Sequence, residues 1–259
     1  PSGGCTHDPG SFGWCLSNAD RQSFMKSTKR FKNKKIFVTG ASRGIGKAIA
    51  QAFRSEGAWV VGTRTGRIEE PDESCNEWFS ADFSDLDQIK HCAGFLGESK
   101  PDVLINNAGI NKNAPFAEID PNTFQLIQQV NVFAPFMLCQ AAIQSMKQNG
   151  WGRIVNVSSI WGKICMAGRA SYSASKFALD GMTTTLAVEH AADGIIANSI
   201  APGFIDTDLT HRMLGDEGIQ AMVSKVPAGR LGKVEEIARF VIWLASEENT
   251  FISGQNIAI

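Results

Sequence analysis

The sequence predicts a single α/β domain built on a doubly wound parallel sheet of about seven strands, with helices on both faces. Three observations lead to this fold class. Short apolar segments alternate with longer amphipathic ones along most of the chain. The short segments are apolar at successive positions, as expected of strands that are buried on both faces. No Pro-, Gly- or Ser-rich linker and no internal repeat interrupts residues 30–259, so one domain is the simplest organisation.

The predicted strands are short segments dominated by Val, Ile, Leu, Phe or Trp. They cover residues 35–39, 59–63, 78–81, 102–106, 153–158, 195–200 and 256–259. The third is the weakest, because Trp78 and Phe79 are its only large apolar side chains. All seven fall at the spacing that a β-α-β alternation requires, so the strands are expected to pair in parallel.

The predicted helices connect these strands and cover residues 44–57, 85–96, 122–149, 171–192 and 235–246. In the first of them, Ile45, Ile49 and Phe53 recur at helical spacing, and Gly57 marks its end. Pro121 begins the long third helix, since proline is favoured in the first turn.

Composition narrows the class of function. The chain has 259 residues, of which 43 % are hydrophobic and 20 % charged, which is typical of a globular domain. Its formal net charge of -1 argues against nucleic acid as a partner. The sequence shows no run of about 18 apolar residues, so no membrane span is predicted.

The 6 cysteines and 4 histidines are scattered rather than grouped at metal-ligand spacing, so no metal site is expected. Cys139 and Cys165 lie in apolar surroundings and are predicted to be buried thiols. Since no secretory segment is recognisable, we expect a cytoplasmic protein.

The first 30 residues differ from the rest of the chain. Residues 1–24 are rich in Ser, Gly, Asp and Asn and show no apolar period. Residues 1–30 are therefore predicted to be a disordered or cloning-derived extension, with Met25 as a candidate start, and residues 31–259 to be the folded domain. The basic stretch 26–35 is interpreted as a solvated lead-in, with a nucleic-acid-binding arm as the alternative.

A glycine-rich turn follows the first strand. Glycines stand at 40, 44 and 46, between a predicted strand and a predicted helix. Gly40 allows a tight turn, Gly44 lets a pyrophosphate approach the backbone at the helix N-terminus, and Gly46 lets the helix pack against the sheet. The turn predicts a dinucleotide-binding domain of the Rossmann type.

The end of the second strand indicates which dinucleotide is bound. A carboxylate that would hold the ribose 2′-hydroxyl is usual there, but this chain has Thr63 and Arg64. Arg64 and Arg43 suit a 2′-phosphate, because a guanidinium matches phosphate oxygens in fork geometry. NADP(H) is therefore predicted over NAD(H), although Arg64 alone is also compatible with a solvated surface residue.

Polar residues gather where later strands end. Asn107 follows the fourth strand, Ser158 and Ser159 end the fifth, and Tyr172 and Lys176 open the helix after it. Tyr172 and Lys176 share one helix face, because they are four residues apart. An ammonium beside a phenol favours the phenolate and lowers a pKa that is ordinarily about 10, which suits acid–base work on an alcohol.

With these motifs in place, the sequence resembles the classical short-chain dehydrogenases/reductases over about residues 33–259. The motifs are TGASRGIG at 39–46, NNAG at 106–109, Asn131, Ser159 and YSASK at 172–176. The resemblance implies that Tyr172 exchanges a proton with the substrate oxygen, that Ser159 positions this oxygen, and that Lys176 lowers the tyrosine pKa and binds the nicotinamide ribose. It further implies that Asn131 holds a water linking Lys176 to solvent.

The resemblance also implies a set of cofactor contacts. They are Gly40, Ser42, Arg43, Gly44, Ile45, Gly46, Thr63, Arg64, Asp82, Phe83, Asn107, Ala108, Gly109, Tyr172, Lys176, Pro202, Gly203, Ile205 and Thr207. Substrate contacts are expected from Ser159, Trp161, Met166 and Tyr172, with Ile164, Asn111 and segment 209–223 around them. Residues 211–225 are expected to form a mobile lid.

Segments 202–208 and 226–232 are similar to those of 3-oxoacyl-(acyl carrier protein) reductases, which suggests a β-keto thioester substrate. Gly150 and Asp193 stand where those enzymes carry arginines that dock the acidic carrier. A sugar, small alcohol or ketone is therefore the alternative substrate, and a non-catalytic dinucleotide sensor is the alternative of another class. The family implies a homo-oligomer, a dimer or tetramer formed through the helices at 122–149 and 171–192, with a small carbonyl or alcohol compound as the other partner.

Overall fold

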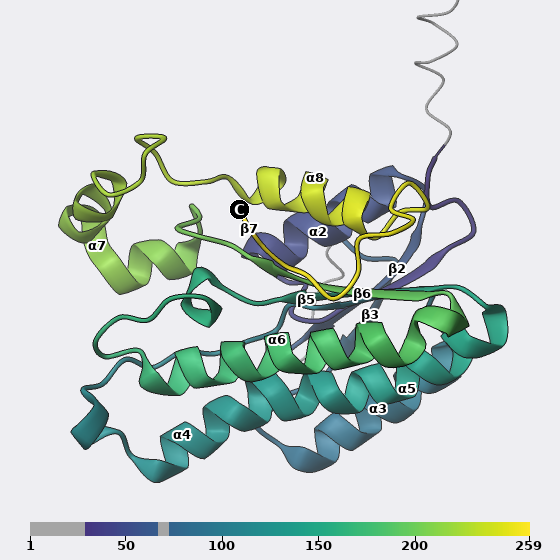
Figure 1. Cartoon of the computed structure of the whole chain (residues 1–259), viewed down its shortest axis with the longest axis horizontal. Helices are drawn as coiled ribbons and strands as arrows, with labels where there is room; N and C mark the ends of the chain where they lie inside the picture. Colours follow the sequence, from purple (N-terminus) through teal and green to yellow (C-terminus); the bar gives the residue numbers. More distant parts are fainter. Residues whose placement is uncertain (1–28, 67–72) are drawn as a thin grey trace, which may run out of the picture.

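A computed structural model describes residues 29–66 and 73–259 and confirms the predicted fold class (Figure 1). The predicted extension over residues 1–30 lies almost entirely outside the described residues. Within them, the Arg30 guanidinium pairs with the Glu56 carboxylate at 2.6 Å, and Phe31 packs edge-on against Phe53 at the end of the first helix.

Seven parallel strands form one sheet in the order β3-β2-β1-β4-β5-β6-β7. Their bounds are β1 Lys35–Val38, β2 Trp59–Arg64, β3 Glu77–Ser80, β4 Val103–Asn106, β5 Gly152–Val157, β6 Ile195–Ala201 and β7 Asn256–Ala258. The strand order reverses between β1 and β4. In an open α/β sheet this switch point is where ligands bind, outside the carboxyl ends of the strands.

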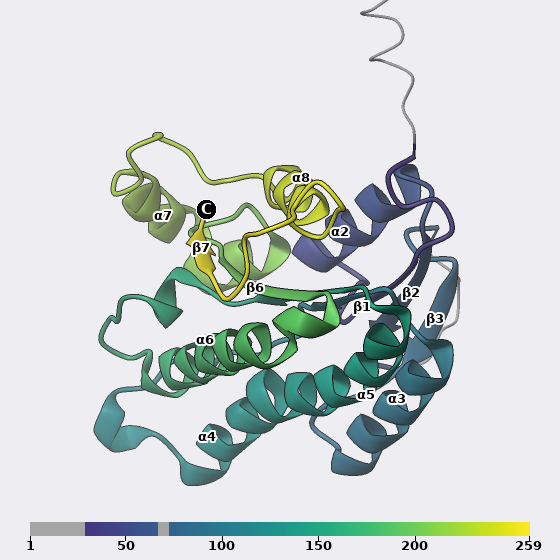
Figure 2. The ribbon, with the colours of Figure 1, turned by 45° about the vertical axis from the view of Figure 1, so that its right-hand side comes forward.

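Helices cover both faces of the sheet (Figure 2). Their bounds are α2 Gly44–Ser55, α3 Leu86–Ser99, α4 Pro121–Gln128, α5 Ala134–Asn149, α6 Ala170–His190, α7 Asp208–Val223 and α8 Val234–Leu244. One apolar core lies between the sheet and α2 with α8, and the other between the sheet and α3 with α5. Successive strand residues supply opposite cores: Ile36 and Val38 face the first, and Phe37 the second.

Two segments add detail that the sequence did not predict. The helix expected over 122–149 is found as a continuous helical run over Pro121–Asn149, in which a π-helical turn at Gln129–Phe133 joins α4 to α5. Much of the expected lid over 211–225 folds as α7, which is kinked at Gly215 (φ 62°, ψ 178°). A left-handed φ is accessible to glycine at little cost, so Gly215 allows two helical pieces to meet at an angle.

The helical run Pro121–Asn149 is long and apolar enough, by length and composition alone, to cross a membrane, and it is the one such run in the described parts of the chain. Half of its most apolar window is buried inside the domain. Leu138, Cys139 and Met146 belong to the core between α5 and the sheet. Packing within this domain therefore accounts for the buried half of the run.

The two cysteine predictions have different outcomes. Cys139 is buried, and burial raises the pKa of its thiol to about 12, so it stays protonated. Cys165 is exposed, which corrects the prediction of a buried thiol. The apolar residues around it lie on a surface loop before α6 and leave the thiol accessible.

Candidate active site

The polar motifs converge on one edge of the sheet, because the carboxyl ends of parallel strands all lie there. The turn at 39–46 follows β1, Asn107 follows β4, Ser159 follows β5 and Pro202 follows β6. α6 begins beside this edge and carries Tyr172 and Lys176 (Figure 1). The structure therefore brings together residues that lie far apart in the sequence.

The glycine turn has the backbone geometry that its sequence predicts. Gly40 and Gly44 both have positive φ, at 63° and 54°. A Cβ on Gly46 would collide with the Gly40 carbonyl and the Asn107 amide, so this position needs glycine. Around Gly44, a Cβ would meet only the Thr207 side chain, at 3.7 Å, among the described residues. The backbone there is open to a ligand, which fits the approach of a pyrophosphate.

Two side chains brace this turn. The Asn107 amide donates to the carbonyls of Thr39 and Gly40, at 2.9 and 3.0 Å. The Thr39 hydroxyl accepts hydrogen bonds from the backbone N–H groups of Asn107 and Ala108, both at 2.9 Å. Asn107 was expected to line the cofactor, and its side chain is engaged in holding the turn. Thr39 was missed, and its position at the end of a buried strand was the signal available in the sequence.

An arginine ends β2 beside the glycine turn. The Nε atom of Arg64 is buried and has no hydrogen-bond partner among the described residues. The Thr63 hydroxyl accepts from the Gly40 N–H at 3.0 Å, so it fastens β2 to the glycine turn. Arg43 is exposed at the N-terminus of α2, where no side chain caps the helix. These groups fit an anionic dinucleotide, because cations and free helix-end N–H groups lie at one place.

The remaining predicted cofactor residues lie around the same edge. The Asp82 carboxylate accepts from the Ser84 N–H at 2.9 Å and from its hydroxyl at 2.7 Å, and Phe83 is buried beneath it. After β6, the Gly203 N–H donates to the Ile259 carbonyl at 2.9 Å, and Ile205 is buried. Thr207 caps α7 through its hydroxyl. The turn containing Asp82 is also held by Gln129, whose amide donates to the Phe83 carbonyl at 3.0 Å, and the segment after β6 reaches the glycine turn through Thr207.

The catalytic candidates form a compact group. Lys176 is buried, and its ammonium lies 5.4 Å from the centroid of the Tyr172 ring. The Nζ atom donates to the Val157 carbonyl at 2.8 Å, which fixes the ammonium at the end of β5. An ammonium has three donors, so others remain for the tyrosine side and for a ribose. Ser159 accepts from the Trp161 N–H at 3.2 Å and is in hydrogen-bonding reach of Tyr172.

Burial dominates the protonation of both groups. It raises the pKa of the Tyr172 phenol, and a hydrogen bond with Ser159 and the charge of Arg169 oppose this rise. It lowers the pKa of Lys176 to about 8, against the attraction of the Asp180 carboxylate. The lowered tyrosine pKa expected from the sequence is therefore not found in the free protein, because desolvation disfavours the phenolate and Lys176 loses its proton before Tyr172 does.

Asn131 stands in the π-helical turn and is buried. Its side chain accepts from the Ile110 N–H and donates to the Ile110 carbonyl, both at 2.9 Å, and donates to the Ser175 hydroxyl at 3.0 Å. A Cβ on Gly109 would lie 3.3 Å from Asn131 Oδ1 and 3.8 Å from Lys176 Nζ. Asn131 therefore fastens the loop after β4 to α6, close to Lys176.

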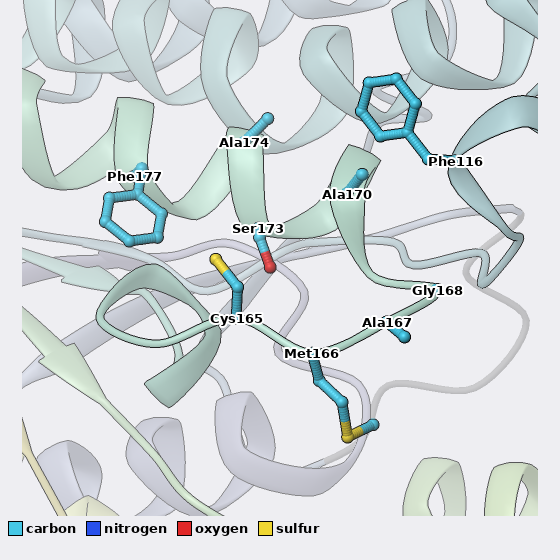
Figure 3. Close-up of a pocket in the computed structure, with 9 residues that line it drawn as sticks. All are labelled: Phe116, Cys165, Met166, Ala167, Gly168, Ala170, Ser173, Ala174 and Phe177. Atoms are coloured by element: carbon cyan, nitrogen blue, oxygen red, sulfur yellow. The ribbon is translucent and has the colours of Figure 1, made fainter.

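The predicted substrate residues do not all lie in one place. Trp161 packs edge-on against Phe204 with ring centroids 6.2 Å apart, and Asn111 has a buried, unpartnered Oδ1. Met166 instead lines a pocket of about 400 Å³ between the loop 165–168, Phe116 and the first turns of α6 (Figure 3). This pocket also includes Cys165, Ser173 and Phe177, and it includes neither Tyr172 nor Trp161. Ile164 is exposed.

The titration of Tyr172 can be measured directly, because it is the only tyrosine in the chain. We expect the tyrosinate absorbance of the cofactor-free protein to appear with a midpoint above the ordinary value of about 10. Arg169→Gln should move the midpoint further up, because it removes a charge that favours the phenolate. A midpoint below the ordinary value in the free protein would show that Lys176, rather than burial, governs this phenol.

Known proteins resemble this chain over most of its length. The family model described as enoyl-(acyl carrier protein) reductase matches residues 40–259. The 3-oxoacyl-(acyl-carrier-protein) reductase FabG of Salmonella typhimurium is 36% identical over 240 residues, covering 88% of this chain and 96% of that protein.

Two solved structures have a similar fold over most of this chain. One described as an NAD(P)-dependent gluconate 5-dehydrogenase from Beutenbergia cavernae, with NADP bound at low occupancy, superposes with a TM-score of 0.84 at 33% identity, covering 89% of this chain and 96% of that one. Another, described as a gluconate dehydrogenase from Agrobacterium tumefaciens, has a TM-score of 0.81 at 27% identity, covering 90% and 96%.

Proposed function

The chain belongs to the short-chain dehydrogenases/reductases, a family of oxidoreductases, and from this premise we propose that it is an NADP(H)-dependent enzyme that interconverts a ketone and a secondary alcohol. The observation that carries the proposal is the group of Ser159, Tyr172 and Lys176 at the carboxyl edge of the sheet. Residues 31–259 are proposed as the catalytic unit.

The residues of this chain divide the acid–base work. When bound, the nicotinamide supplies or accepts the hydride at the substrate carbon. In reduction, the Tyr172 hydroxyl donates its proton to the carbonyl oxygen, which Ser159 holds by hydrogen bonding. The raised pKa of Tyr172 keeps this donor protonated at neutral pH. The Lys176 ammonium stabilises the phenolate that remains and binds the ribose, while Asn131 holds the water that carries a proton towards solvent.

The proposed cofactor is NADP(H). Arg64, with its unpartnered Nε, supplies the fork for a 2′-phosphate, and Arg43 adds a second cation at the start of α2. The bound NADP of the Beutenbergia cavernae structure supports a site of this type in a relative. The other residues of the proposed cofactor set are those of the glycine turn, the loop after β4 and the segment after β6.

A 3-oxoacyl thioester is the first substrate class we propose, on the likeness to the FabG reductases. Gly150 closes α5 in the left-handed conformation, and the Asp193 carboxylate pairs with Lys147 at 3.2 Å and His190 at 2.9 Å. Neither position offers a cation to an acidic carrier protein, so a small thioester is favoured over a carrier-bound one. The gluconate dehydrogenase neighbours favour a sugar or small alcohol as the second class.

We also propose a homo-oligomer formed through the long helices. Several apolar side chains on the helical run Pro121–Asn149 and on α6 are exposed, which is typical of a surface that packs against another subunit. They are Phe124, Leu126, Phe133, Phe136, Phe177 and Val188.

The pH dependence of carbonyl reduction tests the role of Lys176. Its pKa is lowered to about 8, so the ammonium is present below this pH and is lost above it. Turnover at saturating substrate should therefore be flat through neutral pH and fall above about 8. A profile that stays flat well beyond this value would contradict the role given to Lys176.

A further inference from the structure

A second buried charge lies beside the proposed catalytic lysine. Asp180 follows Lys176 by one helical turn on α6, so the two share a face. A Cβ on Gly162 would lie 2.7 Å from Asp180 Oδ2 and 3.1 Å from the Cβ of Lys176. The carboxylate therefore lies against the base of the lysine side chain, in space that only a glycine at 162 leaves free. None of the sequence motifs included Asp180.

The carboxylate is anchored from the far edge of the sheet. The Asn256 amide, on β7, donates to Asp180 Oδ2 at 2.5 Å. Asn256 is opposite Ser199 in the β6–β7 pairing, so the anchor depends on the correct register of the last strand. Burial raises the pKa of Asp180, and the polar groups of Ser158, Ser199 and Asn256 with the charge of Lys176 oppose this rise.

Few other charges act on this pair. On α6, Tyr172 and Asp180 are the titratable groups beside Lys176, and Arg169 faces Tyr172 from the start of the helix. Against them, β5, β6 and β7 present the Val157 carbonyl, Ser199 and Asn256, which are uncharged. Within the described residues, Asp180 is thus the negative charge that acts on the lysine.

We propose that Asp180 is a positioning residue: held by Asn256 in the space over Gly162, it keeps Lys176 charged on the Val157 carbonyl beside Tyr172. The inference rests on the proposed function, since Asp180 acts on the reaction only through Lys176. It links the last strand of the sheet to the protonation of the active site.

The test compares Asp180→Asn with the unaltered enzyme. Removing the negative charge should move the alkaline fall in turnover to lower pH by roughly one unit, as expected of a charge one helical turn from the lysine. Asp180→Glu should restore the profile at least in part. Glu189→Gln removes a charge from an exposed position of the same helix and should leave the profile unchanged.

A second readout needs neither cofactor nor turnover. Because the pKa of Lys176 is lower in the folded than in the unfolded state, the unfolded state binds more protons between about 8 and the ordinary value of 10.5. Lys176 therefore contributes a rise in stability with pH through this window, which the raised pKa values of the buried Cys92 and Cys139 thiols oppose. The thiols are the same in Asp180→Asn and in the unaltered protein. When the two stability profiles are compared by denaturant unfolding of the free protein, the rise due to Lys176 should begin at a pH lower by roughly one unit in Asp180→Asn.

The inference is overturned if Asp180→Asn shows the same dependence of turnover on pH, and of stability on pH, as Glu189→Gln. Asp180→Ser is the second variant if the asparagine variant does not fold, because the smaller side chain fits the same space and its hydroxyl can accept from the Asn256 amide. The same shift is expected from it. The two proposals can fail separately. If the stability profile of Asp180→Asn shifts but Tyr172→Phe keeps full turnover, the proposed function is wrong and the link between Asp180 and Lys176 remains supported.

Discussion

Replacing Tyr172 by phenylalanine should lower turnover by roughly 10³-fold or more, the range expected when a positioned proton donor is lost. The substitution removes one hydroxyl and leaves the ring beside the Lys176 ammonium. Dinucleotide affinity should change by no more than about twofold, because the glycine turn and Arg64 are untouched. Steady-state reduction gives the first quantity, and quenching of tryptophan fluorescence on titration with the dinucleotide gives the second.

A matched control is available on the same helix. Thr185→Val also removes a hydroxyl, one that donates to the Gly181 carbonyl at 3.2 Å on the exposed side of α6. This variant should keep its turnover. If Tyr172→Phe instead retains turnover within about tenfold, or loses dinucleotide binding, then Tyr172 is not the proton donor and serves to shape the site.

Arg64→Asp should reverse the dinucleotide preference. The ratio of kcat/KM for NADPH over NADH is expected to fall by roughly two orders of magnitude, because one charge-assisted hydrogen bond is worth about 1.5–3 kcal/mol. Like-charge repulsion between the new carboxylate and the 2′-phosphate adds to this loss. The same carboxylate can hold the ribose hydroxyls of NADH, as acids at this position do in dinucleotide domains.

The effect of Arg64→Asp must be separated from that of a general change in charge. Arg239→Asp, at an exposed position of α8, makes the same change in net charge away from the sheet edge and should keep the ratio of the unaltered enzyme. An unchanged ratio in Arg64→Asp would show that the 2′-phosphate is recognised elsewhere or that the enzyme does not distinguish the two cofactors.

Local patterns were sufficient to predict the strands, the doubly wound arrangement and the convergence of the motifs. Short apolar segments and a glycine turn between β1 and α2 determine these features from neighbouring residues alone. The order of the strands was not predicted, because the handedness of β-α-β connections is compatible with more than one doubly wound order. Ser159, Tyr172 and Lys176 are brought together for the same reason, because β5 and α6 are consecutive elements.

Features set by contacts between distant elements were not predictable. The π-helical turn at Gln129–Phe133 places Asn131 where it binds the Ile110 backbone and Ser175, and the sequence of a continuous apolar helix contains no sign of it. The role of Asp180 needs Asn256, which is 76 residues away. The exposure of Cys165 depends on how one loop lies on α6.

The protonation of the site shows the same limit. Tyr172 and Lys176 were expected to interact from their spacing, and they do lie together. Spacing does not reveal that Lys176 is buried and Tyr172 partly buried, and desolvation raises the pKa of the tyrosine while lowering that of the lysine. The direction in which the pKa of Tyr172 shifts could be obtained only from its three-dimensional surroundings.

The central claim is tested most directly by following the loss of dihydronicotinamide absorbance with NADPH and, in parallel, with NADH. The purified protein is offered an acetoacetyl thioester, simple ketones, diketones and keto-sugars. We predict reduction of at least one of these carbonyls, faster with NADPH than with NADH, and the best substrate decides between a thioester and a sugar. Tight binding of NADPH without reduction of any carbonyl would contradict the account and would favour a dinucleotide-sensing protein.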